Sequence, residues 1–155
     1  MVNIIEKTEL SASEKLQLID LWNNEYPARV GLKGVADLDH YYSNIYNSTH
    51  YLIEEQNEII GWANKFSRAN EKWFLIIIRR DHQGKGIGNI LLKHIIIDES
   101  NLNGWVVDHN EYLKSDGTVY RSPLDFYAKN NFEIFENIRV FNGKINAIKI
   151  IYNNG

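Results

Sequence analysis

A short glycine-rich segment carries the clearest chemical signal in this sequence. Gly84, Gly86 and Gly88 fill three of five consecutive positions where a predicted strand gives way to a predicted helix. Each glycine inside a helical turn costs roughly 1 kcal/mol relative to alanine, so the pattern indicates that a ligand approaches the backbone closely. The free N–H groups of a helix start, together with the nearby Lys85 and Arg80, form a cradle for a phosphate group. The alternative is a turn that serves only tight packing of the helix on a sheet.

The spacing of the glycines separates the phosphate-binding motifs. A P-loop requires Ser or Thr directly after Gly-Lys to hold magnesium, whereas Lys85 is followed by Gly86. A dinucleotide-binding turn requires a third glycine where Asn89 or Leu91 stands. Asp108 ends the next predicted strand, where a ribose-binding acid would lie, so a nicotinamide cofactor stays open as an alternative.

Hydrophobic periodicity predicts the elements that position this turn. The predicted helices are 11–27, 38–45, 85–99 and 122–129. The predicted strands are 3–8, 50–54, 58–66, 73–78, 104–108, 132–138 and 145–152. Because one helix separates strands 73–78 and 104–108, we expect these two strands to run parallel near the centre of the sheet.

Local signals support several of these elements. Ser11 and Glu14 form a capping box at the start of the first helix, and Asp37 is placed to cap the second. The run 73–78 is apolar throughout, which predicts a central strand buried on both faces.

Two motifs resemble those of the GNAT superfamily of acetyl-CoA-dependent N-acetyltransferases. Residues 83–88, Gln-Gly-Lys-Gly-Ile-Gly, match its signature of Gln or Arg, two residues, Gly, one residue, then Gly or Ala. Residues 125–132 resemble its Phe-Tyr-x-Lys-x-Gly-Phe segment, with Asn131 in place of the glycine, and Asn also tolerates a left-handed helix end. The order of predicted elements agrees with the family over nearly the whole chain. The resemblance implies one α/β (α+β) domain over 1–155, with a mixed, mostly antiparallel sheet of about seven strands flanked by about four helices.

The resemblance also implies that acetyl-CoA is bound as a cosubstrate. The strand before the motif would hydrogen-bond the pantetheine arm through its backbone, and the glycine turn would hold the pyrophosphate. The residues assigned to acetyl-CoA in this way are Ile76, Ile77, Ile78, Gln83, Gly84, Lys85, Gly86, Ile87, Gly88 and Asn89. Tyr127 matches the family's general acid, because a phenol is protonated at neutral pH and can return a proton to a thiolate. Its alternative role is aromatic packing.

The group that deprotonates the amine is not specified by the motifs. An alkylamine with a pKa of about 10.4 must lose a proton to a side chain or through ordered water. Asp108 is the candidate base, with recognition of a cationic acceptor or capping of a turn as alternatives. Tyr120 stands where the family usually has Asn, and the connection 109–122 is unusually long. Arg79 and Arg80 either flank the 3′-phosphate of coenzyme A or form a solvated strand end.

Composition excludes several other function classes. The chain has 155 residues, 44% of them hydrophobic, which fits one domain with a full core. Its formal charge of -3 gives no electrostatic basis for nucleic-acid binding. The absence of cysteine excludes disulfides, Cys-based zinc sites and thiol nucleophiles, and the scattered histidines predict no metal site. No apolar run approaches the ~18–20 residues of a membrane span and no signal segment is present, so we expect a cytoplasmic protein without a membrane partner.

These inferences predict an N-acetyltransferase that moves an acetyl group from acetyl-CoA to a primary amine of a small molecule or peptide in a ternary complex. A non-catalytic CoA-binding sensor or interaction module is the alternative, and Tyr127 favours the enzyme. Acceptor specificity is expected from the connections 25–39 and 109–122. The acids of these connections suit a cationic acceptor: Glu25, Asp37, Asp39, Asp108 and Glu111. Formation of a homodimer and transfer of other acyl groups are left open.

Overall fold

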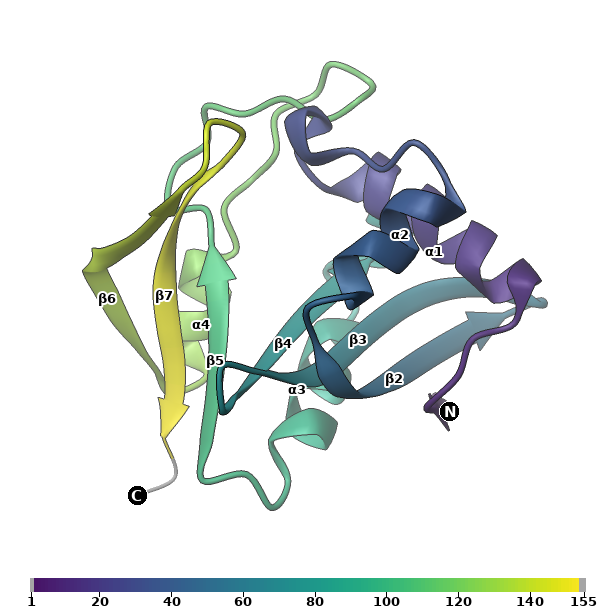
Figure 1. Cartoon of the computed structure of the whole chain (residues 1–155), viewed down its shortest axis with the longest axis horizontal. Helices are drawn as coiled ribbons and strands as arrows, with labels where there is room; N and C mark the ends of the chain where they lie inside the picture. The colour runs from purple at the N-terminus through teal and green to yellow at the C-terminus, as the bar shows by residue number, and fades with distance from the viewer. Residues whose placement is uncertain (1, 154–155) are drawn as a thin grey trace.

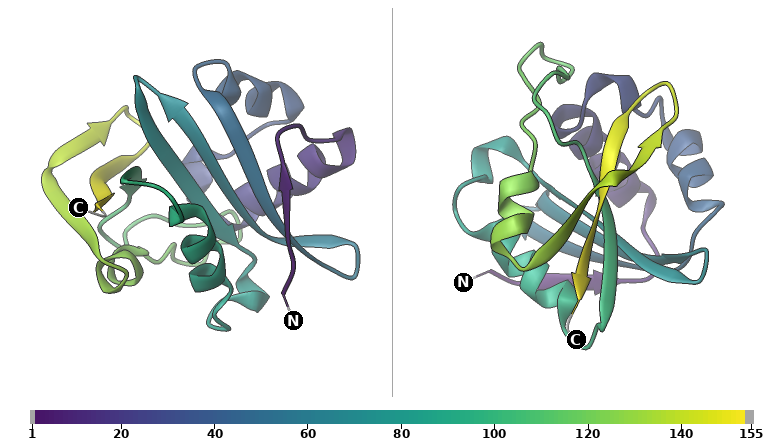
Figure 2. Two further views of the ribbon diagram at one scale, coloured as in Figure 1. Left: turned by 90° about the horizontal axis from the view of Figure 1, so that it is seen from below. Right: turned by 90° about the vertical axis from the view of Figure 1, so that its left-hand side faces the viewer.

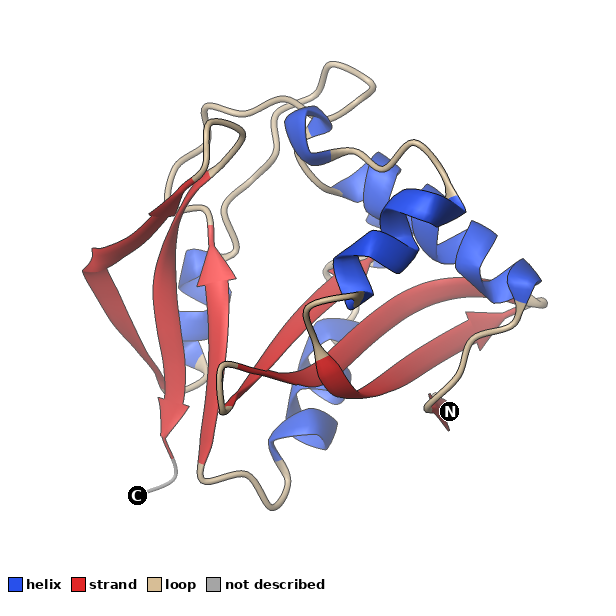
Figure 3. Cartoon of the chain, viewed as in Figure 1, coloured by secondary structure: helices blue, strands red, loops and turns tan. Residues whose placement is uncertain are grey.

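The computed structural model describes residues 2–153, which form one seven-stranded sheet flanked by helices (Figure 1, Figure 3). The strands are β1 (Ile4–Lys7), β2 (Tyr46–Glu55), β3 (Glu58–Arg68), β4 (Glu71–Ile78), β5 (Asn101–Val106), β6 (Phe132–Phe141) and β7 (Asn146–Asn153). The α-helices are α1 (Ala12–Glu25), α2 (Val35–Tyr42), α3 (Ile87–Ile96) and α4 (Leu124–Lys129). Two short 3-10 helices, η1 (Ala28–Val30) and η2 (Arg80–His82), follow α1 and β4.

The sheet is mixed and mostly antiparallel, as the sequence predicts. Its strand order is β1-β2-β3-β4-β5-β7-β6, and β4 with β5 is its parallel pair. That pair is joined by the crossover through α3, which confirms the expected strand–helix–strand unit. Helices α1 and α2 cover one face, and α3 and α4 cover the other (Figure 1, Figure 2).

Two apolar cores hold these layers together. Leu91, Ile95 and Ile148 belong to the core between the sheet and helices α3 and α4, and each is fully buried. Leu18 and Trp62 belong to the smaller core beneath α1 and α2, and both are also fully buried. Burial of a large aliphatic side chain stabilises a fold by about 1.5–3 kcal/mol, so each helix is fixed chiefly by its apolar face.

Local turn chemistry agrees with several expectations. The capping box is present, because the Ser11 hydroxyl accepts from the Glu14 N–H and the Glu14 carboxylate accepts from the Ser11 N–H. Gln56 and Asn57 both have positive φ in the turn between β2 and β3. Asn131 has φ of 68° just after α4, so it takes the left-handed conformation expected of the glycine it replaces.

Some predicted boundaries are wrong. Helix α2 begins at Val35 after Gly34, so Asp37 lies inside the first turn and is not the N-cap. The Asp37 carboxylate instead accepts a hydrogen bond from the Lys33 N–H, which precedes the helix. The motif helix is shorter than expected, because the left-handed conformation of Gly86 delays its start to Ile87.

The prediction that the run 73–78 is buried on both faces is wrong in part. Trp73 and Ile77 are buried, whereas Ile76 and Ile78 are only partly covered. The reason is that β5 diverges from β4 after the single register pair between Trp73 and Asn103, which opens the sheet beside the second half of β4 (Figure 1).

None of the helices in the described residues is long and apolar enough to cross a membrane.

Candidate active site

A cavity of about 1000 Å³ lies in the opening between β4 and β5. Residues from both faces of the sheet line it, including Glu25 at the end of α1 and Tyr127 on α4. Backbone groups of β4 beyond Trp73 have β3 on one side and the cavity on the other. A strand edge that faces a cavity can hydrogen-bond an extended ligand as if it were a further strand.

The glycine turn forms one end of this cavity. Gly84 and Gly86 have φ of 77° and 84°, in the region that favours glycine, and a Cβ at either position would meet no atom within 4 Å. Gly86 is the N-cap of α3 and has no side chain with which to bind the N–H groups of the first helical turn. Space and free donors therefore coincide, as an anion-binding turn requires. Gly88 differs, because a Cβ there would lie 3.4 Å from the Phe126 ring, so this glycine also serves close packing of α3.

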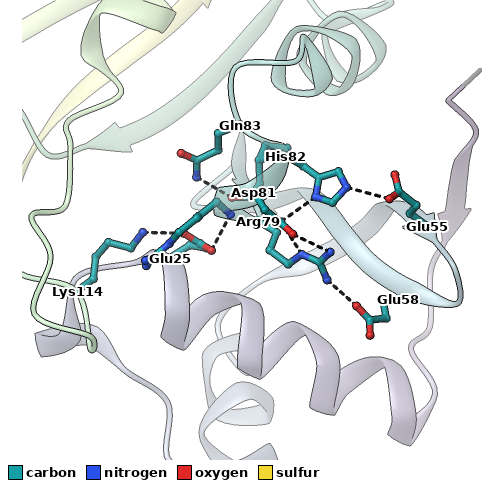
Figure 4. A network of polar contacts seen from close by, with 10 residues as sticks. Glu25, Glu55, Glu58, Arg79, Asp81, His82, Gln83 and Lys114 are labelled. Carbon is teal, nitrogen blue, oxygen red and sulfur yellow. Dashed lines mark hydrogen bonds and ion pairs between the residues drawn. The ribbon is translucent and has the colours of Figure 1, made fainter.

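The structure brings together most of the residues assigned to acetyl-CoA. The cavity is lined by Ile76, Ile77, Ile78, Gln83, Gly84, Gly86, Gly88 and Asn89. Lys85 is exposed beside the turn, and Ile87 is buried in the core beneath α3. The Gln83 amide donates a hydrogen bond of 2.8 Å to the carbonyl of Ile78, which ties the turn to the end of β4 (Figure 4).

Charged side chains anchor the start of the turn. Arg79 binds Glu58 and Asp81, and the Asp81 carboxylate also contacts Nδ1 of His82 (Figure 4). The Asp81 contact, followed by a second contact with Glu55, raises the pKa of His82. The Arg80 guanidinium lies 2.6 Å from the Asp116 carboxylate, so both arginines left open by the sequence have protein partners.

Tyr127 lies where α4 meets the cavity. Its side chain is 5% exposed and packs edge-on against Phe74 and Phe132. Burial raises the pKa of the phenol well above its usual value. Within the described chain its hydroxyl makes no hydrogen bond, so the proton is free to interact with a bound substrate.

Asp108 lies two residues beyond the end of β5, outside the set of residues that line the cavity. Its carboxylate accepts hydrogen bonds of 2.8 and 3.2 Å from the Arg139 guanidinium. This pairing lowers the pKa of Asp108, so the group would have to leave a cation in order to accept a proton. Its role as the base stays a prediction.

Aromatic side chains make up the wall of the cavity under α1 and α2. They are Trp22, Tyr26, Tyr41, Phe66, Trp73, Trp105 and Tyr120. Sequence reasoning did not identify this wall, and it also missed Arg68, which borders it. Side chains alternate along β3, so Arg68 lies on the same face as Trp62 and Phe66. This alternation could have identified Arg68 from the sequence.

The long connection 109–122, here called the strap, crosses from the end of β5 to α1 and η1 (Figure 1). The carbonyl of Leu113 accepts from the Ala28 N–H, and Ser115 donates to the carbonyl of Asn23. The Lys114 ammonium lies 2.8 Å from Glu25, which is buried and also accepts from the Arg80 N–H (Figure 4). The strap therefore links the two sides of the cavity.

No group of three or more His, Asp or Glu side chains in residues 2–153 is arranged to hold a metal ion.

Comparison with known proteins agrees with this geometry. The family model of the acetyltransferase (GNAT) domain matches residues 46–134, more than half of the chain. No curated protein matches the sequence.

Solved structures share the whole fold at low sequence identity. An aminoglycoside 6′-N-acetyltransferase complexed with coenzyme A has a TM-score of 0.71 at 14% identity, over 96% of this chain and 95% of that chain. The protein smu.2055 from Streptococcus mutans has a TM-score of 0.69 at 16% identity, over 97% and 96%. A ribosomal-protein-alanine N-acetyltransferase from Brucella melitensis has a TM-score of 0.64 at 10% identity, over 95% and 98%.

Proposed function

This chain belongs to the GNAT acetyltransferase family, and we propose that it transfers the acetyl group of acetyl-CoA to a primary amine by direct attack in a ternary complex. The observation that carries the proposal is the opening between β4 and β5, bordered by a free strand edge, a glycine turn and a buried tyrosine. Acetyl-CoA supplies an activated thioester, and the protein must orient it and manage the protons.

The chain's own groups suit acetyl-CoA in two ways. The backbone of Ile76, Ile77 and Ile78 borders the cavity, where it can pair with the amide groups of the pantetheine arm. The turn 83–89 offers open space at its left-handed glycines and unshared N–H groups at the start of α3, which suit a pyrophosphate. The carbonyl of Ile78 already accepts from Gln83, so pairing with the arm falls to the other backbone groups of this segment.

Tyr127 is proposed to return the proton to the departing sulfur. Its raised pKa keeps the proton in place at neutral pH, and the same burial would raise the proton affinity of a thiolate beside it. Donation toward the sulfur therefore stabilises the leaving group inside the cavity.

A protonated amine must lose a proton before it can attack. In our proposal Asp108 accepts this proton, or it acts on the acceptor through its partner Arg139. Ordered water is the remaining route for the proton.

The Gly86→Glu variant tests the proposal. It places a bulky anion where the pyrophosphate would lie, so calorimetry should detect no binding of coenzyme A, and release of free thiol from acetyl-CoA with a panel of amines should cease. Gly143→Glu is the matched control, because Gly143 also has positive φ and no atom within 4 Å of its Cβ position, but lies between β6 and β7. Wild-type affinity for coenzyme A in a folded Gly86→Glu protein would refute the proposed site.

A further inference from the structure

The cavity wall under α1 and α2, here called the acceptor wall, combines aromatic surface with the Arg68 guanidinium, which forms an ion pair with no carboxylate of the described residues. We propose that the acceptor is a small amino acid-like molecule, in which the amine is accompanied by a carboxylate on an apolar or aromatic skeleton, and that Arg68 binds this carboxylate. The inference rests on the proposed acetyl transfer and names its substrate class.

Arg68 is held by rings and not by an acid. Its Cζ lies 4.6 Å from the centroid of the Trp73 ring and 5.5 Å from that of Phe66. Across the described residues no carboxylate forms an ion pair with it, and its cross-strand neighbour Glu71 instead lies 3.8 Å from Lys149. A guanidinium on the face of a tryptophan keeps its N–H edge available, and that planar fork matches the two oxygens of a carboxylate.

A second cation lies near Trp73, although it is outside the residues that line the cavity. The Lys149 ammonium lies 5.4 Å from the centroid of the same Trp73 ring. The Glu71 carboxylate at 3.8 Å compensates one of the two cations, and its side chain is about half exposed. The local charge around Trp73 is therefore positive, which favours an anionic group on the ligand.

The remaining walls suit an apolar body. Trp73 and Trp105 stack with centroids 5.4 Å apart and planes inclined by 24°. Tyr41 packs edge-on against Trp22 at 5.4 Å on the other side of the acceptor wall. Such rings present large apolar faces, which an alkyl or aryl side chain can cover.

The acids that suggested a cationic acceptor have other partners. Glu25 is the one acid among the residues that line the cavity, and it is paired with Lys114. Asp39 binds Lys15, and the Asp37 carboxylate accepts a hydrogen bond from the Lys33 N–H. A polyamine or aminosugar would thus meet few free carboxylates, and the sequence expectation of a cationic acceptor has no support in the cavity wall.

Arg68 and Tyr127 approach β4 from opposite faces of the sheet. Trp73 contacts Arg68, whereas the next residue, Phe74, points to the face covered by α3 and α4, where its ring centroid lies 5.6 Å from that of Tyr127. An acceptor bound at Arg68 would therefore present its amine to the thioester through the opening beside β4, where β5 diverges.

Equilibrium binding tests the carboxylate directly, without turnover. Calorimetry on the protein saturated with coenzyme A would compare L-phenylalanine with phenethylamine and L-leucine with isopentylamine, which lack only the carboxylate. We expect each amino acid to bind at least about tenfold more tightly than its amine, as a charge-assisted bidentate contact provides. Arg68→Gln should abolish this preference, and Arg68→Lys should retain part of it. Arg121→Gln is the control, because Arg121 also borders the cavity but is exposed at its rim.

The outcomes separate this inference from the proposed function. Equal or weaker binding of both amino acids, no binding of either pair, or an unchanged preference in folded Arg68→Gln and Arg68→Lys proteins would overturn the inference. Acetylation of the amines without a carboxylate preference would overturn it while leaving the acetyltransferase proposal intact. Selective binding of the amino acids, lost in Arg68→Gln, with no release of thiol from acetyl-CoA would support the site and refute acetyl transfer to these acceptors.

Discussion

Lys114 and Glu25 stand 89 positions apart in the sequence, yet the Lys114 ammonium lies 2.8 Å from Oε1 of Glu25, with only 11% and 5% of their side chains exposed. The pair fastens the strap to the end of α1, on the border of the cavity. Removing one member leaves the other buried without its counter-charge, which is the more costly way to break such a pair.

We therefore expect Lys114→Met to lower the free energy of unfolding by about 3–5 kcal/mol. Chemical denaturation would measure the loss, and the double variant Lys114→Met with Glu25→Gln should recover part of it. Lys33→Met, at an exposed lysine, should stay within about 0.5 kcal/mol of the wild type. A Lys114→Met protein as stable as the wild type would show that the pair contributes nothing net.

Tyr127→Phe should lower kcat by about 10²–10⁴-fold, because it removes the proposed proton donor and keeps the ring. Contacts with Phe74 and Phe132 persist, so coenzyme A affinity and the melting temperature should change little. Steady-state rates with an identified acceptor provide the measurement. Tyr46→Phe is the control, because Tyr46 is 48% exposed and lies outside the residues that line the cavity. Unchanged kcat in Tyr127→Phe would leave this tyrosine as a packing residue.

Asp108→Asn should reduce kcat/KM while leaving coenzyme A affinity nearly intact. The pairing with Arg139 lowers the pKa of Asp108, so this carboxylate is ionised at neutral pH and its titration is expected in the acidic range. If Asp108 is the base, kcat/KM falls as the pH drops through this lowered pKa, and Asp108→Asn removes that fall. Arg139→Gln then moves the fall to higher pH, because the guanidinium that lowers the pKa of Asp108 is gone. If Asp108 only positions Arg139, the two variants lose activity equally with parallel profiles. An unchanged kcat/KM in Asp108→Asn removes it from the site.

His50 makes the stability of the fold depend on pH in the mildly acidic range. Burial lowers its pKa to about 4, and its Nδ1 accepts a hydrogen bond from Trp62. In the unfolded chain the imidazole takes up a proton near pH 6.5, whereas in the folded chain it does so only near pH 4. The contribution of neutral His50 to stability is therefore complete above pH 6.5 and is lost as the pH falls toward 4. The loss should reach roughly 3 kcal/mol, measured as the free energy of unfolding at several pH values. His50→Gln should remove this slope, whereas His40→Gln, at an exposed residue, should retain it.

Most of the fold is predictable from local patterns in the sequence. The order of strands and helices follows from hydrophobic period, the capping box at Ser11 and the turn residues, because each signal acts over a few neighbouring positions. Errors lie at the ends of elements, where competing caps such as Gly34 and Asp37 differ by too little energy for the sequence pattern to decide.

The nucleotide end of the site is likewise predictable, because the glycine turn is contiguous in the chain. The acceptor end is not, since Arg68, Trp73 and Trp105 come together only through strand pairing and the divergence of β5. Each of these residues is of a type that ordinary strands contain. Only their register in the sheet brings them together as a binding wall.

The single register pair between Trp73 and Asn103 also has a mechanical meaning. It divides the sheet into a four-stranded and a three-stranded leaf, which are held across the seam by few backbone hydrogen bonds and by the amide of Asn103 on the carbonyl of Lys72. A ligand bound across the seam would link the two leaves. Amide protons of β5 should then exchange with deuterium more slowly in the ligand-bound protein than in the free one. Bound substrate would therefore make the unfolding of the two leaves more cooperative.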